Sequence, residues 1–220
     1  MEITYFGVAA FRLKGVQATV VCDPYSPKVG FRLPSLTAEI VLVSHQHDDH
    51  NFTKGVGGTK DRREPVVITA PGEYEVSEVA VYGYATWHDN KEGAERGGNT
   101  VYLAVVDGVR IAHLGDLGHM LSERLVEELA GVDVMLIPVG GEYMIGVAAA
   151  VKIIEAIQPA IVVPMHYKLP GLARSFDKLV DEQEFVKAVG GEVKREDKLV
   201  VVKSEIPEPT EYVVLTAKFK

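Results

Sequence analysis

Short apolar runs alternate with glycine-rich or polar turns through the first half of the chain. Many runs are rich in valine, isoleucine, tyrosine and threonine, and several alternate apolar with polar residues, a pattern typical of strands. Gly7 and Gly15 punctuate the first runs, and Asp107-Gly108 predicts a tight hairpin. We therefore predict strands over 2–6, 9–14, 16–22, 39–44, 65–70, 76–81, 82–87, 100–106 and 109–113.

The second half of the chain alternates helical with strand-like spacing. Ser122 is a typical cap for a helix over 121–130, and Gly190-Gly191 would end another helix over 175–189. The remaining periodicity predicts a helix over 146–157 and strands over 132–137, 160–164, 192–203 and 210–219. This order predicts an α/β (α+β) fold in one domain over 1–220, with sheets inside and helices outside.

The composition narrows the class of protein. Hydrophobic residues make up 47% and charged residues 25% of 220, as in globular proteins. The net charge of −8 argues against a general polyanion-binding protein, although a small phosphorylated substrate stays open. No run reaches the roughly 18 apolar residues of a membrane span, and no signal peptide pattern is present. We expect a cytoplasmic location, and we interpret the single Cys22 as a buried hydrophobe.

The hexapeptide His45-Gln46-His47-Asp48-Asp49-His50 carries the most chemistry. It follows the β-branched run 40–44, which predicts a buried strand. Three imidazoles and two carboxylates at the end of a core strand are costly unless they are paired or bind metal. Neutral imidazole and ionised carboxylate are the groups that zinc and similar cations accept. The hexapeptide therefore predicts a metal site.

The other histidines strengthen this prediction. His88 and His166 each follow a strand-like run, and His113 ends another run three residues before Asp116. His119 lies three residues after Asp116. Histidines placed for other reasons would also fall on the predicted helices and in the C-terminal fifth of the chain, and none does.

The spacing His-x-His-x-Asp-His resembles the signature of the metallo-β-lactamase superfamily of metal-dependent hydrolases. The family's later ligands have matches in the same order, so the resemblance covers nearly the whole chain. Three stretches resemble the branch that holds ascorbate-6-phosphate lactonase and small uncharacterised hydrolases: Asn99–Tyr102, His113–His119, and Pro138–Gly141 with Pro164–Tyr167. The resemblance implies an αββα sandwich of two mixed sheets flanked by helices, with the site at one edge.

The family pattern also implies two metal sites. The first would be formed by His45, His47 and His88, and the second by Asp49, His50 and His166, with Asp116 as the bridge. Three protein ligands per ion leave a position open for water, as in catalytic sites. The candidate catalytic residues are Asp49 and His119. His119 is either a general acid for the leaving group or a residue at the start of a helix, whereas His113 is interpreted as a core histidine or a support for a ligand.

These observations favour a dinuclear metal-dependent hydrolase, in which a metal-bound hydroxide attacks an ester, lactone or phosphodiester-type small molecule. We expect two divalent metal ions. Zn²⁺ suits this set of ligands best, and Mn²⁺, Fe²⁺ and Ni²⁺ are the alternatives. An RNA or DNA phosphodiesterase of the same fold and a non-enzymatic metal-binding protein are the alternatives. A di-iron redox protein is disfavoured because His47 stands where such relatives carry glutamate. The expected partner is a small, anionic or phosphorylated substrate, not nucleic acid or membrane, with a homo-oligomer left open.

Substrate contacts have weaker signals. A basic loop follows the hexapeptide and contains Lys54, Lys60, Arg62 and Arg63. We interpret it as a solvated surface loop; the alternative is that its positive charge attracts an anionic substrate to the site. Two pairs would lie at the rim of the pocket if the implied fold is right: Tyr143 with Met144, and Tyr167 with Lys168.

Overall fold

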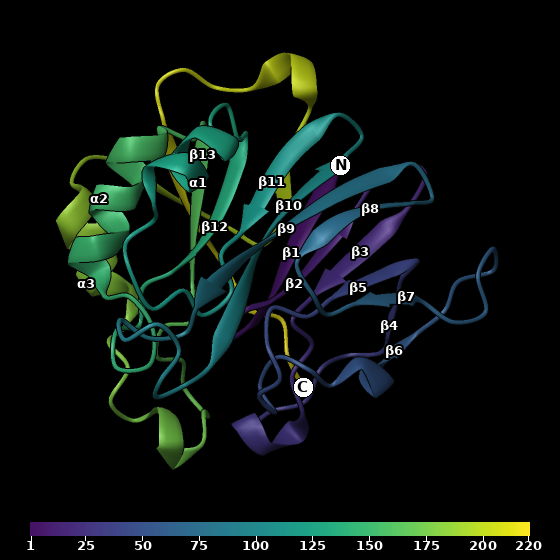
Figure 1. Ribbon diagram of the computed structural model, residues 1–220, viewed down its shortest axis with the longest axis horizontal. Coiled ribbons are helices and arrows are strands. Elements are labelled where there is room, and N and C mark those ends of the chain that lie inside the picture. Colours follow the sequence, from purple (N-terminus) through teal and green to yellow (C-terminus); the bar gives the residue numbers. More distant parts are fainter.

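A computed structural model describes residues 1–220, and its strands form two large sheets that pack face to face (Figure 1). One sheet has six strands in the order β15–β1–β2–β3–β5–β7. Its members are β1 (Glu2–Gly7), β2 (Ala10–Lys14), β3 (Thr19–Cys22), β5 (Ile40–Leu42), β7 (Val66–Ile68) and β15 (Leu199–Val200). A small parallel pair, β4 (Leu36–Thr37) and β6 (Val56–Gly57), lies beside it.

The second sheet has eight strands in the order β14–β16–β13–β12–β11–β10–β9–β8. They are β8 (Gly72–Val76), β9 (Val79–Trp87), β10 (Gly98–Val106), β11 (Val109–His113), β12 (Val134–Pro138), β13 (Ile161–Met165), β14 (Val193–Glu196) and β16 (Glu211–Leu215). Strands β8 to β11 are antiparallel neighbours, whereas β11, β12 and β13 run parallel. The carboxyl ends of β9, β11 and β13 therefore lie at the same edge of this sheet.

Three α-helices lie together on the left of Figure 1, over the eight-stranded sheet. They are α1 (Glu123–Glu128), α2 (Val147–Ile157) and α3 (Glu182–Val189), and four 3₁₀ turns cover Pro27–Val29, Thr53–Gly55, Arg174–Phe176 and Lys203–Glu205. No helix is both long and apolar enough to span a bilayer. The two-sheet architecture confirms the predicted fold class. The α-helices bury residues only in the 45-residue core cluster, so loops and 3₁₀ turns cover the outer face of the six-stranded sheet.

The run 40–43 shows why the six-stranded sheet is buried on both faces. Ile40 and Leu42 point into the core between the sheets, whereas Val41 and Val43 join a second cluster of 15 residues on the outer face. Successive side chains of a strand alternate between faces, so a strand covered on both sides needs an unbroken apolar run. The hexapeptide follows this strand directly, and the rigidity of the strand fixes where the hexapeptide lies.

Three elements differ from their predictions. The helix expected over 175–189 begins only at Glu182, after the capping side chain of Asp181, because the backbone of Val180 pairs with Gly140 and Lys168 instead. The strand expected over 192–203 is two short strands: β14 pairs with β16 in one sheet, and β15 pairs with β1 in the other. The strands expected over 76–81 and 82–87 are one strand, β9, which forms a hairpin with β8 through Ser77 and Glu78.

Candidate metal centre

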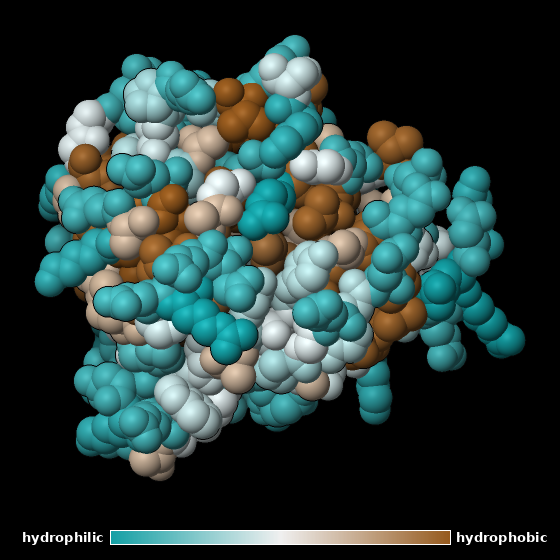
Figure 2. All heavy atoms as spheres, turned by 45° about the horizontal axis from the view of Figure 1, so that its top comes forward, coloured by the Kyte–Doolittle hydropathy of each residue, from teal (hydrophilic) through white to brown (hydrophobic).

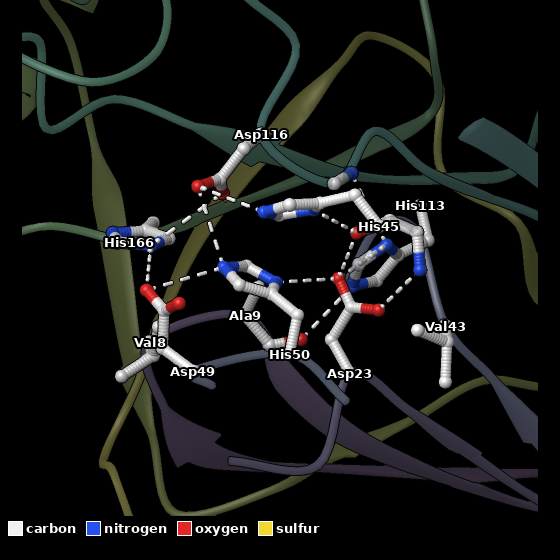
Figure 3. Close-up of polar contacts among 12 residues, drawn as sticks. Val8, Ala9, Asp23, Val43, His45, Asp49, His50, His113, Asp116 and His166 are labelled. Atoms are coloured by element: carbon white, nitrogen blue, oxygen red, sulfur yellow. Dashed lines mark hydrogen bonds and ion pairs between the residues drawn. The ribbon is translucent and has the colours of Figure 1, made fainter. Parts of the chain in front are cut away.

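Strand ends from both sheets bring the predicted ligands together (Figure 3). The hexapeptide follows β5 of the six-stranded sheet, whereas His88, Asp116 and His166 follow β9, β11 and β13 of the eight-stranded sheet. Because the ends of these three strands lie at one edge, residues far apart in sequence meet there. The site is therefore assembled across the gap between the two sheets.

The seven predicted ligands form two groups. His45, His47 and His88 each offer a ligand atom within 4.8 Å of the others, and so do the members of a second group: Asp49, His50, Asp116 and His166. All are buried except His47, which is exposed, and Asp49, which is half-buried. The grouping is the one that the sequence resemblance implies, with Asp116 placed among the ligands of the second group.

Asp116 lies between the two groups. Its Oδ2 is 3.2 Å from His88 Nε2, 3.3 Å from His50 Nε2 and 3.9 Å from His45 Nε2. Its Oδ1 is 3.5 Å from His166 Nε2. The Asp116 side chain is 3% exposed, so its carboxylate has imidazole nitrogens around it in place of water. One carboxylate thus faces both groups (Figure 3).

The donor set fits divalent metal ions. Ligand atoms around a tetrahedral zinc ion are about 3.4 Å apart, and Asp49 Oδ2 lies 3.5 Å from His50 Nε2 and 3.6 Å from His166 Nε2. The Nε2 atoms of His45, His50 and His166 are buried without a hydrogen-bond partner, as is Oδ1 of Asp116. Buried polar atoms without partners are rare and costly, and coordination to a cation would satisfy all four.

Asp23 supports this arrangement from behind. Its Oδ2 lies 2.8 Å from Nδ1 of His50 and accepts a hydrogen bond of 2.6 Å from the Ser44 hydroxyl. The same hydroxyl lies 2.9 Å from Nδ1 of His45. A histidine whose Nδ1–H donates in this way can keep its Nε2 lone pair free for a metal, so Asp23 and Ser44 orient two candidate ligands at once.

The electrostatics of the site follow from burial and from its close charges. Burial and the neighbouring His50 lower the pKa of His45 to about 3, which keeps that imidazole neutral. Burial opposes charge on His50, but Asp116, Asp49 and Asp23 raise its pKa well above the usual range, and a cation bound at Nε2 would take the place of the proton held there. Burial likewise opposes ionisation of Asp49, and the positive charge of His50 nevertheless holds its pKa well below the usual value. Both carboxylates of the second group therefore stay ionised, since the pKa of Asp116 is also far below its ordinary value despite burial.

Two other histidines lie outside both groups. His113 donates from Nε2 to the carbonyl of Ala9 at 2.9 Å and accepts the Gly115 N–H at Nδ1, so it is a buried support as interpreted from the sequence. His119 accepts the Trp87 N–H at Nε2 (3.0 Å), and its Nδ1 lies 2.8 Å from the Met120 carbonyl. With both ring nitrogens bonded to backbone, the geometry favours a structural role for His119 over that of a general acid.

A pocket of about 300 Å³ opens beside the two groups. Four candidate ligands face it: His47, Asp49, His88 and Asp116. The rest of the wall comes from five segments: Lys28 and Val29 in the first 3₁₀ turn, Asp48 in the hexapeptide, Arg96 after β9, Tyr143 before α2, and Ser175 and Phe176 in the third 3₁₀ turn. Of the rim residues expected from the sequence, only Tyr143 lines the pocket, because Met144 and Tyr167 are packed in the core and Lys168 donates a hydrogen bond to the Asp177 carbonyl.

The basic loop does not reach this pocket. None of its four cations lines the pocket, and residues 58–65 extend away at the right of Figure 1. Hydrophilic side chains project from the same side in Figure 2. The structure thus agrees with the interpretation of a solvated loop.

Three residues of the site have no place among the sequence predictions. Asp23 could have been found from its position at the end of β3, which runs parallel to β5 and ends beside it. Asn99 accepts the Asp116 N–H at 3.0 Å and donates to the Leu114 carbonyl, a pairing that no spacing rule indicates. Arg96 lies in the polar, glycine-rich segment 89–98, whose sequence shows neither strand nor helix spacing.

Comparisons with known proteins agree with this geometry. Residues 2–166 match the Beta-lactamase superfamily domain. A UPF0173 metal-dependent hydrolase of Archaeoglobus fulgidus is 30% identical over 217 residues, which cover 86% of this chain and 90% of that protein.

Solved structures show the same fold. A crystal structure described as a Zn-dependent hydrolase of the metallo-beta-lactamase superfamily, from Thermotoga maritima, is 34% identical with a TM-score of 0.79 and 97% of each chain covered. Igni18, a metallo hydrolase from Ignicoccus hospitalis, is similar in fold at 22% identity and a TM-score of 0.62, covering 86% of this chain and 89% of that one.

Proposed function

The chain belongs to the UPF0173 metal-dependent hydrolase family of the beta-lactamase superfamily, and from this premise we propose that it hydrolyses small molecules with a pair of divalent metal ions. The proposed substrates are esters, lactones or small phosphodiesters, and the proposed metal is zinc. A lactone substrate would agree with the resemblance of three stretches to the ascorbate-6-phosphate lactonase branch.

One observation carries the proposal: the buried imidazoles of both groups, among them His88 and His50, face the one carboxylate of Asp116. We propose that His45, His47 and His88 hold one ion, that Asp49, His50 and His166 hold the other, and that Asp116 contacts both. Bound divalent ions would supply Lewis acidity, which makes water a nucleophile at neutral pH and stabilises negative charge on the attacked group. A set of five imidazoles and two carboxylates without thiolate suits zinc, and it also accepts manganese, iron or nickel.

Side chains of this protein would orient the reaction. Asp49 has the most exposed carboxylate of its group, 20% against 3% for Asp116, and it faces the pocket. Because its pKa is well below the usual range, Asp49 is ionised at neutral pH and has no proton to donate. It is also a weak base, so its proposed role is to orient the attacking water by accepting a hydrogen bond from it. The apolar wall of Val29 and Phe176 would exclude water from one side of a bound substrate.

The size of the pocket supports a small substrate. A volume of about 300 Å³ is at the lower end of the range for small-molecule sites. A nuclease usually adds an extended basic surface for the phosphate backbone, whereas this chain has a net charge of −8 and its basic loop lies away from the pocket. The nucleic-acid alternative therefore has less support than a small-molecule hydrolase.

Metal analysis combined with a substrate screen tests the proposal. The protein would be stripped with a chelator, reloaded with Zn²⁺ or Mn²⁺, analysed for metal per chain and assayed on esters, lactones and phosphodiesters. We expect about two ions per chain, turnover only in the loaded protein, and loss of both one ion and turnover in His47→Ala. Gln46→Ala, in the same hexapeptide, is the matched control and keeps both. Two bound ions without any turnover would favour the non-enzymatic alternative, and cleavage confined to RNA or DNA would favour the nuclease.

A further inference from the structure

Arg96 is a cation at the pocket whose guanidinium has no acceptor within the protein. Two basic side chains line the pocket, and the other, Lys28, forms an ion pair of 2.6 Å with Asp48. Arg96 instead stacks on Tyr143, with its guanidinium carbon 4.6 Å from the centroid of the ring. Stacking uses one face of the planar group and leaves its N–H donors at the edge free for an oxygen ligand.

The backbone on both sides of Arg96 is tied to the metal centre. Asp89, the residue after His88, accepts backbone N–H bonds from four residues of this loop, among them Arg96 at 2.8 Å; the others are Lys91, Gly93 and Glu95. The carbonyl of Gly97 accepts the N–H of His88 at 3.0 Å. The loop 89–97 is therefore closed on the segment that carries a candidate ligand, and Arg96 has a fixed position relative to it.

Tyr143 is fixed as well. Its hydroxyl donates a hydrogen bond of 2.6 Å to the carbonyl of Ser175, which joins the loop before α2 to the 3₁₀ turn Arg174–Phe176. Three loops thus meet around the guanidinium of Arg96. An arginine that is held in place on a ring, half-buried and without an ion pair has the arrangement of a preorganised binding group, because little side-chain entropy is left to lose.

We propose that Arg96, stacked on Tyr143, binds an oxyanion of the substrate, a carboxylate or a phosphate, away from the bond that is hydrolysed. This inference rests on the proposed function and names the substrate class: small anionic esters or lactones. The planar fork of a guanidinium matches the two oxygens of either oxyanion. The interaction would be the same in the bound substrate and in the transition state, so it would act on KM more than on kcat.

Matched substrates test the inference. One series is p-nitrophenyl pentanoate, mono-p-nitrophenyl glutarate and p-nitrophenyl phosphonobutanoate, which differ only in a terminal methyl, carboxylate or phosphonate. The second series is γ-butyrolactone and its derivatives with a carboxylate or a phosphate. We expect the zinc-loaded wild type to prefer an anionic member of a series by roughly 10- to 100-fold in kcat/KM. Comparison of the carboxylate member of each series with its phosphonate or phosphate member shows which oxyanion the protein recognises.

Variants assign the preference to Arg96. Arg96→Gln should raise KM for the anionic substrate by roughly 10- to 100-fold with little change in kcat, and it should leave the neutral member of the pair unaffected, which also shows that the variant is folded. Arg96→Lys, which keeps the charge but loses the fork, should recover only part of the loss. Tyr143→Leu should raise KM several-fold, whereas Tyr143→Phe, which keeps the ring, should change it less. Lys91→Gln removes a charge from the same loop and is the matched control.

The outcomes separate this inference from the proposed function. Equal kcat/KM for neutral and anionic members, or an equal effect of Arg96→Gln on both, would overturn the role of Arg96 while leaving the hydrolase intact. A wild-type KM in Arg96→Lys would overturn recognition by the planar fork. If the metal-loaded protein hydrolyses no member of either series and no compound of the wider screen, the proposed function itself fails.

Discussion

Asp23 Oδ2 lies 2.8 Å from His50 Nδ1, which joins a carboxylate of the six-stranded sheet to a candidate ligand with no exposed side-chain surface. The pairing fixes the ring of His50 and leaves Nε2 toward Asp49 and Asp116. Because the partner of a metal-binding histidine sets its tautomer and orientation, the carboxylate should matter for metal affinity although it touches no metal.

The first prediction concerns this pair. Asp23→Asn keeps the shape of the side chain but removes its charge, so we expect metal affinity to fall by roughly 10- to 100-fold. Competition with a fluorescent chelator measures the affinity. Asp197→Asn, at an exposed aspartate between β14 and β15, is the control and should bind metal like the wild type. An unchanged affinity in Asp23→Asn would mean that His50 is oriented without its carboxylate.

A second prediction concerns metal removal. Without a cation, three Nε2 atoms and one carboxylate oxygen are buried without partners, so bound metal should stabilise the fold strongly. Binding at about 1,000 times the dissociation constant adds about 4 kcal/mol, which corresponds to a rise of roughly 8 to 16 °C in Tm for a chain of this size. Differential scanning fluorimetry with chelator and then with added Zn²⁺ measures the shift, and an identical Tm in both would contradict a metal centre at these residues.

Close backbone contacts behind two ligands give a third prediction. A Cβ on Gly140 would lie 2.1 Å from the carbonyl oxygen of His166, and one on Gly118 would lie 2.4 Å from the carbonyl carbon of His88. Gly140→Ala and Gly118→Ala should each displace a ligand-bearing segment, costing about 1–3 kcal/mol in the free energy of unfolding and lowering the metal content. At Gly57 the same substitution meets only ordinary contacts, so Gly57→Ala should retain both properties.

Asp89 gives a prediction for pH. Partial burial opposes its ionisation, but the backbone N–H groups of the loop lower its pKa from 3.8 to about 2. A lowered folded-state pKa contributes stability that is present above the ordinary pKa and is lost as the pH falls toward the folded value. The wild type should therefore be more stable than Asp89→Asn at neutral pH, and the difference should shrink between about pH 4 and about pH 2. Urea unfolding of both metal-free proteins across this range measures it; a constant difference would show that the charge of Asp89 is not what holds the loop.

His119 can be tested through the leaving group. Since both of its ring nitrogens face backbone groups, His119→Ala should lower stability by about 1–2 kcal/mol and reduce kcat for good and poor leaving groups alike. A general acid would instead show a loss of roughly 100-fold or more that is confined to alkoxide leaving groups. Comparing aryl and alkyl esters of one acid distinguishes the two roles.

The sequence predicted most of the fold because its strands carry their own signal. The run 40–43 is apolar throughout, as a strand buried on both faces must be, and Ser122 caps α1 as predicted. The helix predicted over 175–189 is confirmed from Glu182 to its end at Val189, but its start was wrong, because periodicity cannot show that the backbone of Val180 is already bonded to Gly140. The prediction of one strand over 192–203 was wrong for a similar reason. The segment divides between two sheets, and this division depends on tertiary contacts that the local sequence does not show.

The candidate ligands could be predicted because their residue types are restricted by chemistry and each follows a strand. Arg96 could not be, because a cation in a glycine-rich loop looks the same in sequence whether it faces solvent or a pocket. Asp89 fixes the loop so that Arg96 faces the pocket. It does so through four hydrogen bonds from backbone N–H groups, which require a loop conformation that no sequence periodicity indicates.

The pairing of β15 with β1 places Glu2 opposite Val200. During synthesis, every candidate ligand up to His166 leaves the ribosome before β15, the second partner of β1, does. The nascent chain therefore has all the candidate metal ligands while the β1 edge of the six-stranded sheet is still unpaired. Unpaired edge strands are sites where chains associate incorrectly. Early capture of metal would hold the two sheets together through this interval, so the supply of metal during translation should affect the yield of native protein.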